Sequence, residues 1–515
     1  MTLLLICFVV FLFLGMPIAF VIGIAGMMFL LVNPEIPNTT IVQRIVAQSQ
    51  SFTFLAVPFF IFAGNLMNVS GITDKLLGLA RLLTRRMYGG TAQISVVMST
   101  LMGGVSGSAT ADAAMETRIL GPEMLKRGYS KGYICAVNCL TALITATIPP
   151  SLGLIIFGFV GDVSIGRLFA AGIIPGFLMM AFLMATTSIT SRIKRYDPPK
   201  SKEEMRIVRT PEADSLTKKK LFSGGKGLII TAAALFLLPA LLDLINDVPF
   251  AGYNFISGWK AHGAVINAQL IFAGIGVLVI LSSFFFKRLP LGVQDLLENL
   301  TDSIWALLFP VILILGIRFG WFTPSESGAF AVVYAIVIGK FVYKELTWQK
   351  FLDSLKTSFR DNGAIMLIIA LSGPFSYAIT YVKLPVMLSD FIFGISNNPQ
   401  ILTMVMLAFL FITGMFVDSN VNFLLLTPIF LPMITSLGMD PVHFGVLMAT
   451  ICTLGVMTPP VGSALYTVCG ILGCPPEEYT KASLPFLAAI FLELCILVFV
   501  PQLVLWIPNM IFGAY

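Results

Sequence analysis

Residues Thr145–Ser151 read TATIPPS and residues Gly455–Val461 read GVMTPPV, so the same proline pair recurs 310 positions later in this 515-residue chain. Glycine and proline are the strongest local markers of turns and helix breaks. Their recurrence in register predicts that one backbone plan is used twice, over residues 1–192 and 301–515. Four further identities keep this offset without a gap: Gly104 with Gly414, Thr117 with Thr427, Pro122 with Pro432, and Gly128 with Gly438.

The composition places both copies in a membrane. Hydrophobic residues make up 57% of the chain and charged residues only 11%, with a mean hydropathy of +0.92. Soluble domains carry about 25% charged residues, so a water-soluble enzyme, a nucleic-acid binder and a disordered scaffold are excluded. Many apolar runs approach the roughly 20 residues that a helix needs to cross a bilayer. We therefore expect an all-α polytopic membrane protein.

Two segments, residues 90–125 and 400–437, are about one and a half spans long and are interrupted midway by polar and glycine residues. Each is typical of a re-entrant helical hairpin, which enters the membrane, turns at a polar tip and leaves on the same side. The alternative is a kinked span followed by a surface helix. The proline pairs predict a broken helix after each hairpin, over residues 131–160 and 441–472, because proline removes a backbone donor.

The charges orient these hairpins. Residues Arg192–Lys226 hold eleven basic and five acidic residues, which accounts for the whole net charge of +6. Six basic residues flank the first hairpin and none flanks the second, so the positive-inside rule opens the first to the cytoplasm and the second to the periplasm. This predicts inverted-topology repeats with a periplasmic N-terminus. Between them, residues 193–300 are expected to form a basic cytoplasmic loop and two extra transmembrane helices.

The hairpin tips and proline breaks are the expected sites of chemistry. Backbone carbonyls freed at such breaks suit a hard cation such as Na⁺, and half-helix N-termini suit an anion. The alternative is that glycine and proline only permit close helix packing. Asp418 is a carboxylate at the second tip, and it either serves function or caps the following half-helix. Glu116 and Arg118 are expected to stabilise the first hairpin, whereas Glu493 has no evident role.

The seven cysteines lie in or beside apolar stretches and show no metal-ligand spacing. They are therefore expected to be small buried hydrophobes rather than a disulfide framework. The two histidines, His262 and His443, are 181 positions apart, so a histidine metal site is not expected.

Six stretches of the chain resemble the large membrane subunit (M, DctM-like) of tripartite ATP-independent periplasmic (TRAP) transporters. The resemblance implies an elevator-type transporter of the bacterial inner membrane that carries an organic acid (a dicarboxylate, keto acid or sugar acid) with Na⁺. It also implies two partners, a small four-helix membrane subunit and a periplasmic solute-binding protein. The matching stretches are VPFFIFAGNLMNVSGI (Val57–Ile72), GGVSGSATADAA (Gly103–Ala114), TIPPS (Thr147–Ser151), GRLFAAGIIPG (Gly166–Gly176), FTPSESGAFAVVYA (Phe322–Ala335) and TPPVG (Thr458–Gly462).

The same resemblance implies the site residues, at positions where this chain matches the family. The first Na⁺ site would use Gly103, Ser106, Thr145, Ile148 and Pro150, and the second would use Gly414, Gly455, Thr458 and Val461. The substrate would contact Ser106, Ser108, Ser151, Asp418 and Asn420. The offset of 310 relates the two ion sites, because Thr145 corresponds to Gly455 and Ile148 to Thr458.

The sequence also bears on three other functions. An ATP-driven pump is disfavoured because Ser223–Lys226 lacks the phosphate-loop pattern. An intramembrane serine protease is suggested only by Gly104–Gly107 and would need a nearby histidine base, so no enzyme activity is expected. A stand-alone Na⁺/dicarboxylate symporter of the related ion-transporter superfamily, working without a binding protein, is the alternative that stays open.

Overall fold

The computed structural model describes residues 2–50, 55–198, 291–318, 321–384, 386–387, 394 and 398–513. Every regular element within these ranges is a helix, as expected of an all-α protein. Most of the predicted basic loop and both predicted extra helices fall in residues 199–290, which lie outside the described residues.

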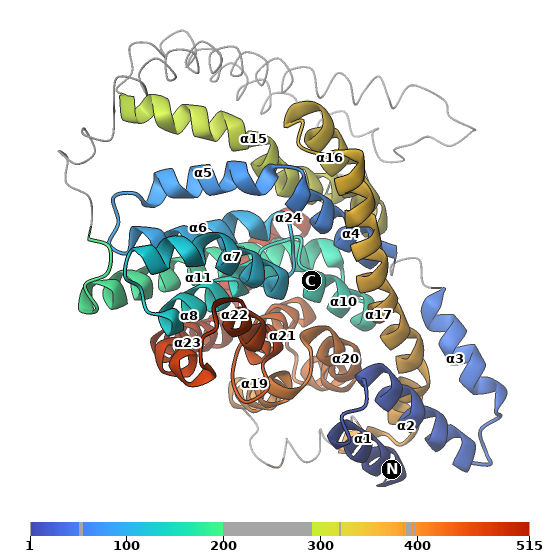
Figure 1. Cartoon of the computed structure of the whole chain (residues 1–515). Coiled ribbons are helices and arrows are strands. Elements are labelled where there is room, and N and C mark those ends of the chain that lie inside the picture. Colours follow the sequence, from blue (N-terminus) through green and yellow to red (C-terminus); the bar gives the residue numbers. More distant parts are fainter. Residues whose placement is uncertain are drawn as a thin grey trace, which may run out of the picture.

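One group of helices runs along the edge of the molecule (Figure 1). In this group α17 packs against α2, α3 and α4, and α16 packs against α4. Thr323 starts α16 with a capping box, in which its side chain and that of Glu326 satisfy each other's backbone amides. The group comprises α1 (Thr2–Phe13), α2 (Ile18–Val32), α3 (Thr39–Ser49), α4 (Ala56–Val69), α15 (Leu291–Arg318), α16 (Pro324–Val337) with its π-helical extension (Ile338–Val342), and α17 (Trp348–Tyr381).

Helix α5 (Ile72–Thr84) connects this group to the rest of the chain. It is bent by 66° from α4, and Gly71 makes the bend with φ +85°, a left-handed conformation that glycine adopts without steric cost. Helix α5 packs against α15 on one side and α6 on the other.

The first copy of the repeat holds the predicted hairpin and broken helix. The hairpin consists of α6 (Gly90–Gly103) and α7 (Ala109–Lys126), with its tip at residues 104–108. The helix that follows is bent by 43° across the proline pair. It comprises α8 (Lys131–Thr141), α9 (Leu143–Thr147) and α10 (Leu152–Gly161), and α11 (Ile165–Ile193) completes the copy.

The second copy repeats this arrangement. Helix α20 begins and ends 310 residues after α7, and the turns that close the two hairpins match. Gly128 (φ +82°) and Gly438 (φ +69°) let Tyr129 N donate to Met124 O (3.1 Å) and Met439 N to Ile434 O (3.0 Å), the Schellman helix end. The elements are α19 (Pro399–Phe416), α20 (Ser419–Ser436), α21 (Pro441–Val456), α22 (Ser463–Leu472), α23 (Pro476–Phe499) and α24 (Gln502–Phe512).

The two copies pack directly on each other, α8 against α23, α10 against α20, and α22 against α7 and α8. Six described helices are long and apolar enough to cross a membrane, or up to eight if each of two bent pairs counts as one span. The chain is therefore a multi-pass membrane protein. Its first hairpin tip and first helix break are largely buried, whereas the second tip and second break include exposed residues such as Asp418 and Val461.

Candidate functional site

A cavity of about 170 Å³ lies where the two hairpin tips approach α4 and α17. Its walls come from the hairpins of both copies of the repeat and from α4 and α17 at the edge of the molecule. Three of the predicted substrate contacts, Ser106, Ser108 and Asn420, line it. The other polar lining side chains are Asn65 and Asn68 of α4 and Asp361 of α17, and Pro150 brings the first helix break to the cavity wall.

The cavity offers oxygen atoms and a negative charge. Asn65 Nδ2 donates to Ser358 Oγ (2.9 Å) and to Asp361 Oδ2 (3.4 Å), which holds two helices together at the cavity wall. The amide oxygen of Asn68 is buried and has no hydrogen-bond partner among the described residues. The residues that line the cavity include no lysine, arginine or histidine.

Glycines allow the first tip to sit against the helix break. Gly107 adopts φ +65°, and a Cβ atom on it would lie 2.4 Å from the carbonyl oxygen of Pro150. A Cβ atom on Gly64 of α4 would lie 2.9 Å from the carbonyl oxygen of Ser106. Any side chain at these positions would push the tip away from its neighbours, so the sequence at the tip is set by the close approach of backbones.

Ser106 and Asp112 form the polar centre of this tip. Ser106 Oγ donates to Asp112 Oδ1 (2.6 Å) and accepts from Ser108 N (3.3 Å). Asp112 is fully buried, and its Oδ2 has no hydrogen-bond partner among the described residues. A buried carboxylate oxygen without a partner is costly, and a bound cation would satisfy it.

The predicted residues of the first sodium site lie together. A Cβ atom on Gly103 would meet the Ile148 side chain at 2.7 Å and the Thr145 Cα atom at 3.5 Å. Thr145 Oγ1 donates to Ser99 O (3.0 Å). Pro150 joins the group through Gly107, and Ser106 connects it to the cavity. The structure therefore brings all five residues to the junction of the first tip and the first break.

Three of the four predicted residues of the second site lie together, and the side chain of the fourth, Val461, lies elsewhere. Gly414 and Gly455 are in backbone contact, because a Cβ atom on Gly455 would lie only 2.5 Å from the carbonyl carbon of Gly414. Thr458 Oγ1 donates to Gly455 O (2.8 Å). The side chain of Val461 instead faces a separate apolar cavity of about 770 Å³ between α1, α17, α19 and α20.

Two predicted substrate contacts do not line the cavity. Ser151 is fully buried, and its hydroxyl is engaged by Ala146 O and Leu154 N at the start of α10. Asp418 is exposed, and its Oδ1 accepts from Asn420 N (2.9 Å) as the N-cap of α20. The capping interpretation of Asp418 is thus confirmed, and a role in binding stays a prediction.

Three charged residues that the sequence analysis singled out, Glu116, Arg118 and Glu493, do not line the cavity. Glu116 is buried and accepts hydrogen bonds from Ser95 (2.5 Å) and Ser99 (2.8 Å), which agrees with a stabilising role inside the hairpin. Arg118 is exposed. Glu493 is buried in α23 with neither carboxylate oxygen bonded among the described residues, and no described contact explains it.

Sequence reasoning missed the contribution of α4 and α17 to the cavity. Asn65 and Asn68 are three residues apart in an apolar helix, a spacing that places both on one face, and this signal could have found them. Asp361 lies among charged residues near the middle of α17, where it was indistinguishable from a solvent-exposed charge.

Comparison with known proteins identifies the family. The model of the tripartite ATP-independent periplasmic transporter, DctM component, matches residues 5–503. The chain belongs to this family. It is similar to the sialic acid TRAP transporter large permease protein SiaM of Vibrio cholerae, with 28% identity over 98% of this chain and 97% of that protein. It is also similar to the 2,3-diketo-L-gulonate TRAP transporter large permease protein YiaN of Escherichia coli, with 26% identity over 95% of each chain.

A solved structure shares the fold. The YdaH transporter of Alcanivorax borkumensis superimposes with a TM-score of 0.53 at 14% identity, covering 90% of this chain and 87% of that one. This likeness concerns the fold alone. The family description and the relatives, which are named as transporter permeases, make the DctM-family chain a transport component and not an enzyme.

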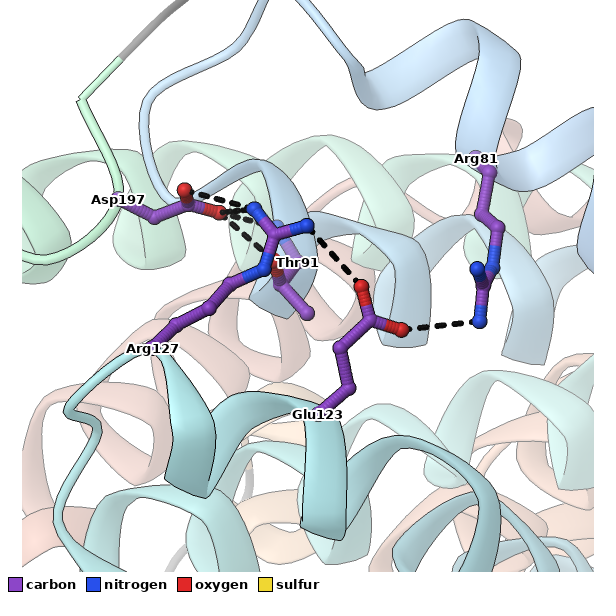
Figure 2. Close-up of polar contacts among 5 residues, drawn as sticks. All are labelled: Arg81, Thr91, Glu123, Arg127 and Asp197. Carbon is purple, nitrogen blue, oxygen red and sulfur yellow. Dashed lines mark hydrogen bonds and ion pairs between the residues drawn. The ribbon is translucent and has the colours of Figure 1, made fainter. Parts of the chain in front are cut away.

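An ion-pair network fastens the foot of the first hairpin in this DctM-family chain (Figure 2). Arg127 at the end of α7 binds Asp197 (2.9 Å) and Glu123 (3.0 Å), and Glu123 binds Arg81 of α5 (2.9 Å). Asp197, which follows α11, also accepts from Thr91 N (3.0 Å) and Thr91 Oγ1 (2.7 Å) at the start of α6. The network therefore joins α5, both hairpin helices and the end of α11.

We expect Asp197→Asn to lower the free energy of unfolding at neutral pH by about 1 kcal/mol. The effect is this small because Arg127 is partly exposed, and solvent screens the charge pair. Burial of the Asp197 carboxyl opposes its ionisation, but the hydrogen bonds from Thr91 and the charge of Arg127 outweigh burial and lower its pKa. A pKa lowered by folding adds stability above the ordinary aspartate value of about 3.9, and this is lost as the pH falls further. Thermal unfolding in detergent should show the deficit at pH 7 and a smaller one below about pH 4.

Asp353→Asn is the control, because Asp353 is an exposed residue of α17 outside the network. An Asp197→Asn deficit that is equal at both pH values would contradict the electrostatic explanation.

Proposed function

We propose that the chain carries out secondary active transport of an organic acid across the bacterial inner membrane, coupled to Na⁺ and dependent on a periplasmic binding protein. The substrate class (a dicarboxylate, keto acid or sugar acid) is supported by relatives named for sialic acid and 2,3-diketo-L-gulonate, both carboxylic acids. The observation that carries the proposal is the cavity at the hairpin tips, lined by Asp361 and polar groups but by no cationic side chain.

The charge of this cavity supports cation coupling. A carboxylate substrate entering it would be repelled by Asp361 and by the nearby Asp112. The N-termini of α7 and α20 point partial positive charge toward the tips, but a helix end supplies only about half a unit charge. Cations bound first would reverse the sign of the local field and raise the affinity for the anion. Binding of the ion and of the substrate would then be linked, which is the requirement for symport.

The first sodium site is proposed at Gly103, Ser106, Thr145, Ile148 and Pro150, with Asp112 added from the structure. Na⁺ is a hard cation that prefers oxygen ligands, and the free Oδ2 of Asp112 is the one anionic oxygen at this junction that has no partner among the described residues. The second site is proposed at Gly414, Gly455, Thr458 and Val461, where backbone carbonyls would supply the ligands and Val461 would contribute only its main chain.

Asp112→Asn is expected to raise the Na⁺ concentration for half-maximal uptake by roughly tenfold, since a hydrogen-bonded or ion-paired charged group is worth about 1.5–3 kcal/mol. Uptake as a function of Na⁺ concentration measures the shift. Asp74→Asn is the matched control, because Asp74 is an exposed aspartate at the start of α5. An unchanged Na⁺ dependence would remove Asp112 from the site.

An elevator mechanism is supported by how the cavity is shared. Its walls come from the two hairpins on one side and from α4 and α17 on the other, so a substrate there lies at a boundary between two helix groups. The moving part would be the two repeats (residues 1–192 and 301–515) without the helices at the edge of the molecule, α1–α4 and α15–α17. Its movement past that boundary would carry the site across the membrane. We propose that the N-terminus lies in the periplasm and that the basic stretch Arg192–Lys226, which opens the inserted segment of residues 193–300, lies in the cytoplasm.

The proposed partners are a small four-helix membrane subunit and a periplasmic solute-binding protein, in keeping with the tripartite description of the family. Reconstitution into proteoliposomes with the small subunit tests the whole proposal, using sialic acid and a C4-dicarboxylate as first substrates and the binding protein encoded beside the gene. Uptake should require both an inward Na⁺ gradient and the binding protein. Uptake without the binding protein would favour the stand-alone symporter, and uptake without Na⁺ would overturn the coupling.

A further inference from the structure

Three cysteines that are distant in sequence meet in the interior of the fold. Cys135 lies on α8, Cys469 on α22 and Cys474 in the turn between α22 and α23, and their Sγ atoms all lie within 4.8 Å of one another. All three are buried. Within the described residues no other group of three cysteine, histidine or carboxylate ligands comes this close.

The turn after α22 sets two of these thiols side by side. Gly473 takes a left-handed conformation (φ +58°), and Cys474 N donates to Cys469 O (2.9 Å). This is the bond of a Schellman helix end, in which the residue after the glycine folds back onto the last turn. An apolar contact commonly accompanies that bond, and here cysteines occupy both positions.

The fold does not need these cysteines. The first copy closes α10 with the same turn, where Val163 N donates to Gly158 O (2.9 Å) and Asp162 has φ +52°. The residues that occupy the same two positions of that turn are Gly158 and Val163, which precede Cys469 and Cys474 by 311 positions rather than 310. The residue 310 positions after Cys135 is Gly445. Since the first copy forms this turn without sulfur, the backbone plan does not require Cys469 and Cys474 in the second copy. It does not require Cys135 on α8 either, because glycine stands at the corresponding position.

We propose that Cys135, Cys469 and Cys474 form a binding site for a soft metal ion with a filled d shell, with Zn²⁺ as the expected occupant. Thiolate sulfur selects such ions. At a Zn–S distance of about 2.3 Å, sulfur ligands lie about 3.8 Å apart, so the cluster needs to contract by only about 1 Å. A water molecule would supply the fourth ligand.

The surroundings suit a charged metal–thiolate centre. Three thiolates around Zn²⁺ leave one negative charge, and Lys131 places its ammonium group next to the cluster by donating to Gly473 O (3.3 Å). Lys131 also marks the end of the molecule at which the first hairpin closes. If the proposed orientation is right, this end faces the cytoplasm, where thiols stay reduced. The metal would join α8 of the first copy to the α22–α23 turn of the second.

The test uses the full chain, purified in detergent under reductant, stripped of metal and titrated with Cd²⁺, which gives a thiolate-to-metal absorption band in the ultraviolet. The wild type should bind one Cd²⁺ per chain, and added Zn²⁺ should compete with Cd²⁺ for the site and weaken the band. The unfolding temperature should be several degrees higher with metal than without it. Cys474→Ser and Cys469→Ser should each lose the band and the shift. Cys495→Ser, which alters a half-buried cysteine of α23 outside the cluster, should keep both.

A wild-type protein that shows no such band, or an unaltered band in both cluster variants, would overturn the site. A disulfide among the three cysteines in protein freshly isolated from cells would also overturn it. Elution of each variant as a single species before titration separates loss of metal binding from loss of folding. Should Cys474→Ser not fold, Cys135→Ala supplies the same comparison from α8, away from the turn.

Discussion

Asp418→Asn is expected to reduce uptake at least about tenfold while the protein inserts and purifies as the wild type does. Asparagine caps a helix about as well as aspartate does, so the bond from Asn420 N and the start of α20 should survive the change. What the variant loses is the negative charge at the second tip. A hydrogen bond to a charged group is worth about 1.5–3 kcal/mol, which corresponds to roughly 10- to 150-fold.

The measurement is Na⁺-driven uptake in proteoliposomes with the binding protein present. Asp353→Asn is the control, since Asp353 is an exposed aspartate of α17 that lies outside both hairpin tips. If Asp418→Ala loses activity while Asp418→Asn keeps it, Asp418 acts only as a cap. Normal uptake by both variants would remove the residue from the mechanism altogether.

Gly455→Ala is expected to abolish Na⁺-dependent uptake and to lower the unfolding temperature. A Cβ atom at this position would lie 2.5 Å from the carbonyl carbon of Gly414, 2.6 Å from its Cα atom and 3.0 Å from its carbonyl oxygen. All three are backbone atoms, so no side-chain rotation relieves the overlap, and α19 must move away from α21. Overpacking of this kind costs about 1–3 kcal/mol, and the shift would separate the proposed ligands of the second site.

Gly470→Ala provides the comparison, because a Cβ atom on Gly470 of α22 meets nothing within 4 Å. Alanine is the better helix former by roughly 1 kcal/mol, so this variant should be at least as stable as the wild type and transport normally. Wild-type uptake by Gly455→Ala would show that close approach of Gly414 and Gly455 is not required.

The duplicated backbone plan could be predicted from sequence because glycine and proline act locally. Gly128 and Gly438 end their hairpins by the same turn, and the helices α7 and α20 keep the predicted offset at both ends. Glycine permits left-handed backbone conformations and proline fixes φ wherever they occur, so their positions carry structural information without knowledge of the tertiary fold.

The cavity and the cysteine cluster could not be predicted in this way. Asn65 meets Asp361 across 296 positions, and the three clustered cysteines come from two different copies of the repeat. Nothing in the local sequence encodes such encounters, which depend on how helix groups pack. Ser151 illustrates the converse: the family resemblance implied a substrate contact, and the structure shows that its hydroxyl caps the start of α10, a role that the resemblance did not indicate.

The division of labour within the site bears on how this transporter can change its solute. The proposed ion ligands are mostly main-chain groups held by glycines and prolines, whereas α4 and α17 line the cavity with side chains such as Asn65, Asn68 and Asp361. Replacement of Asn65 and Asn68 could therefore change the transported solute while leaving both the proposed ion ligands and the charge of Asp361 in place. A library restricted to these two positions would be a compact starting point for such retargeting.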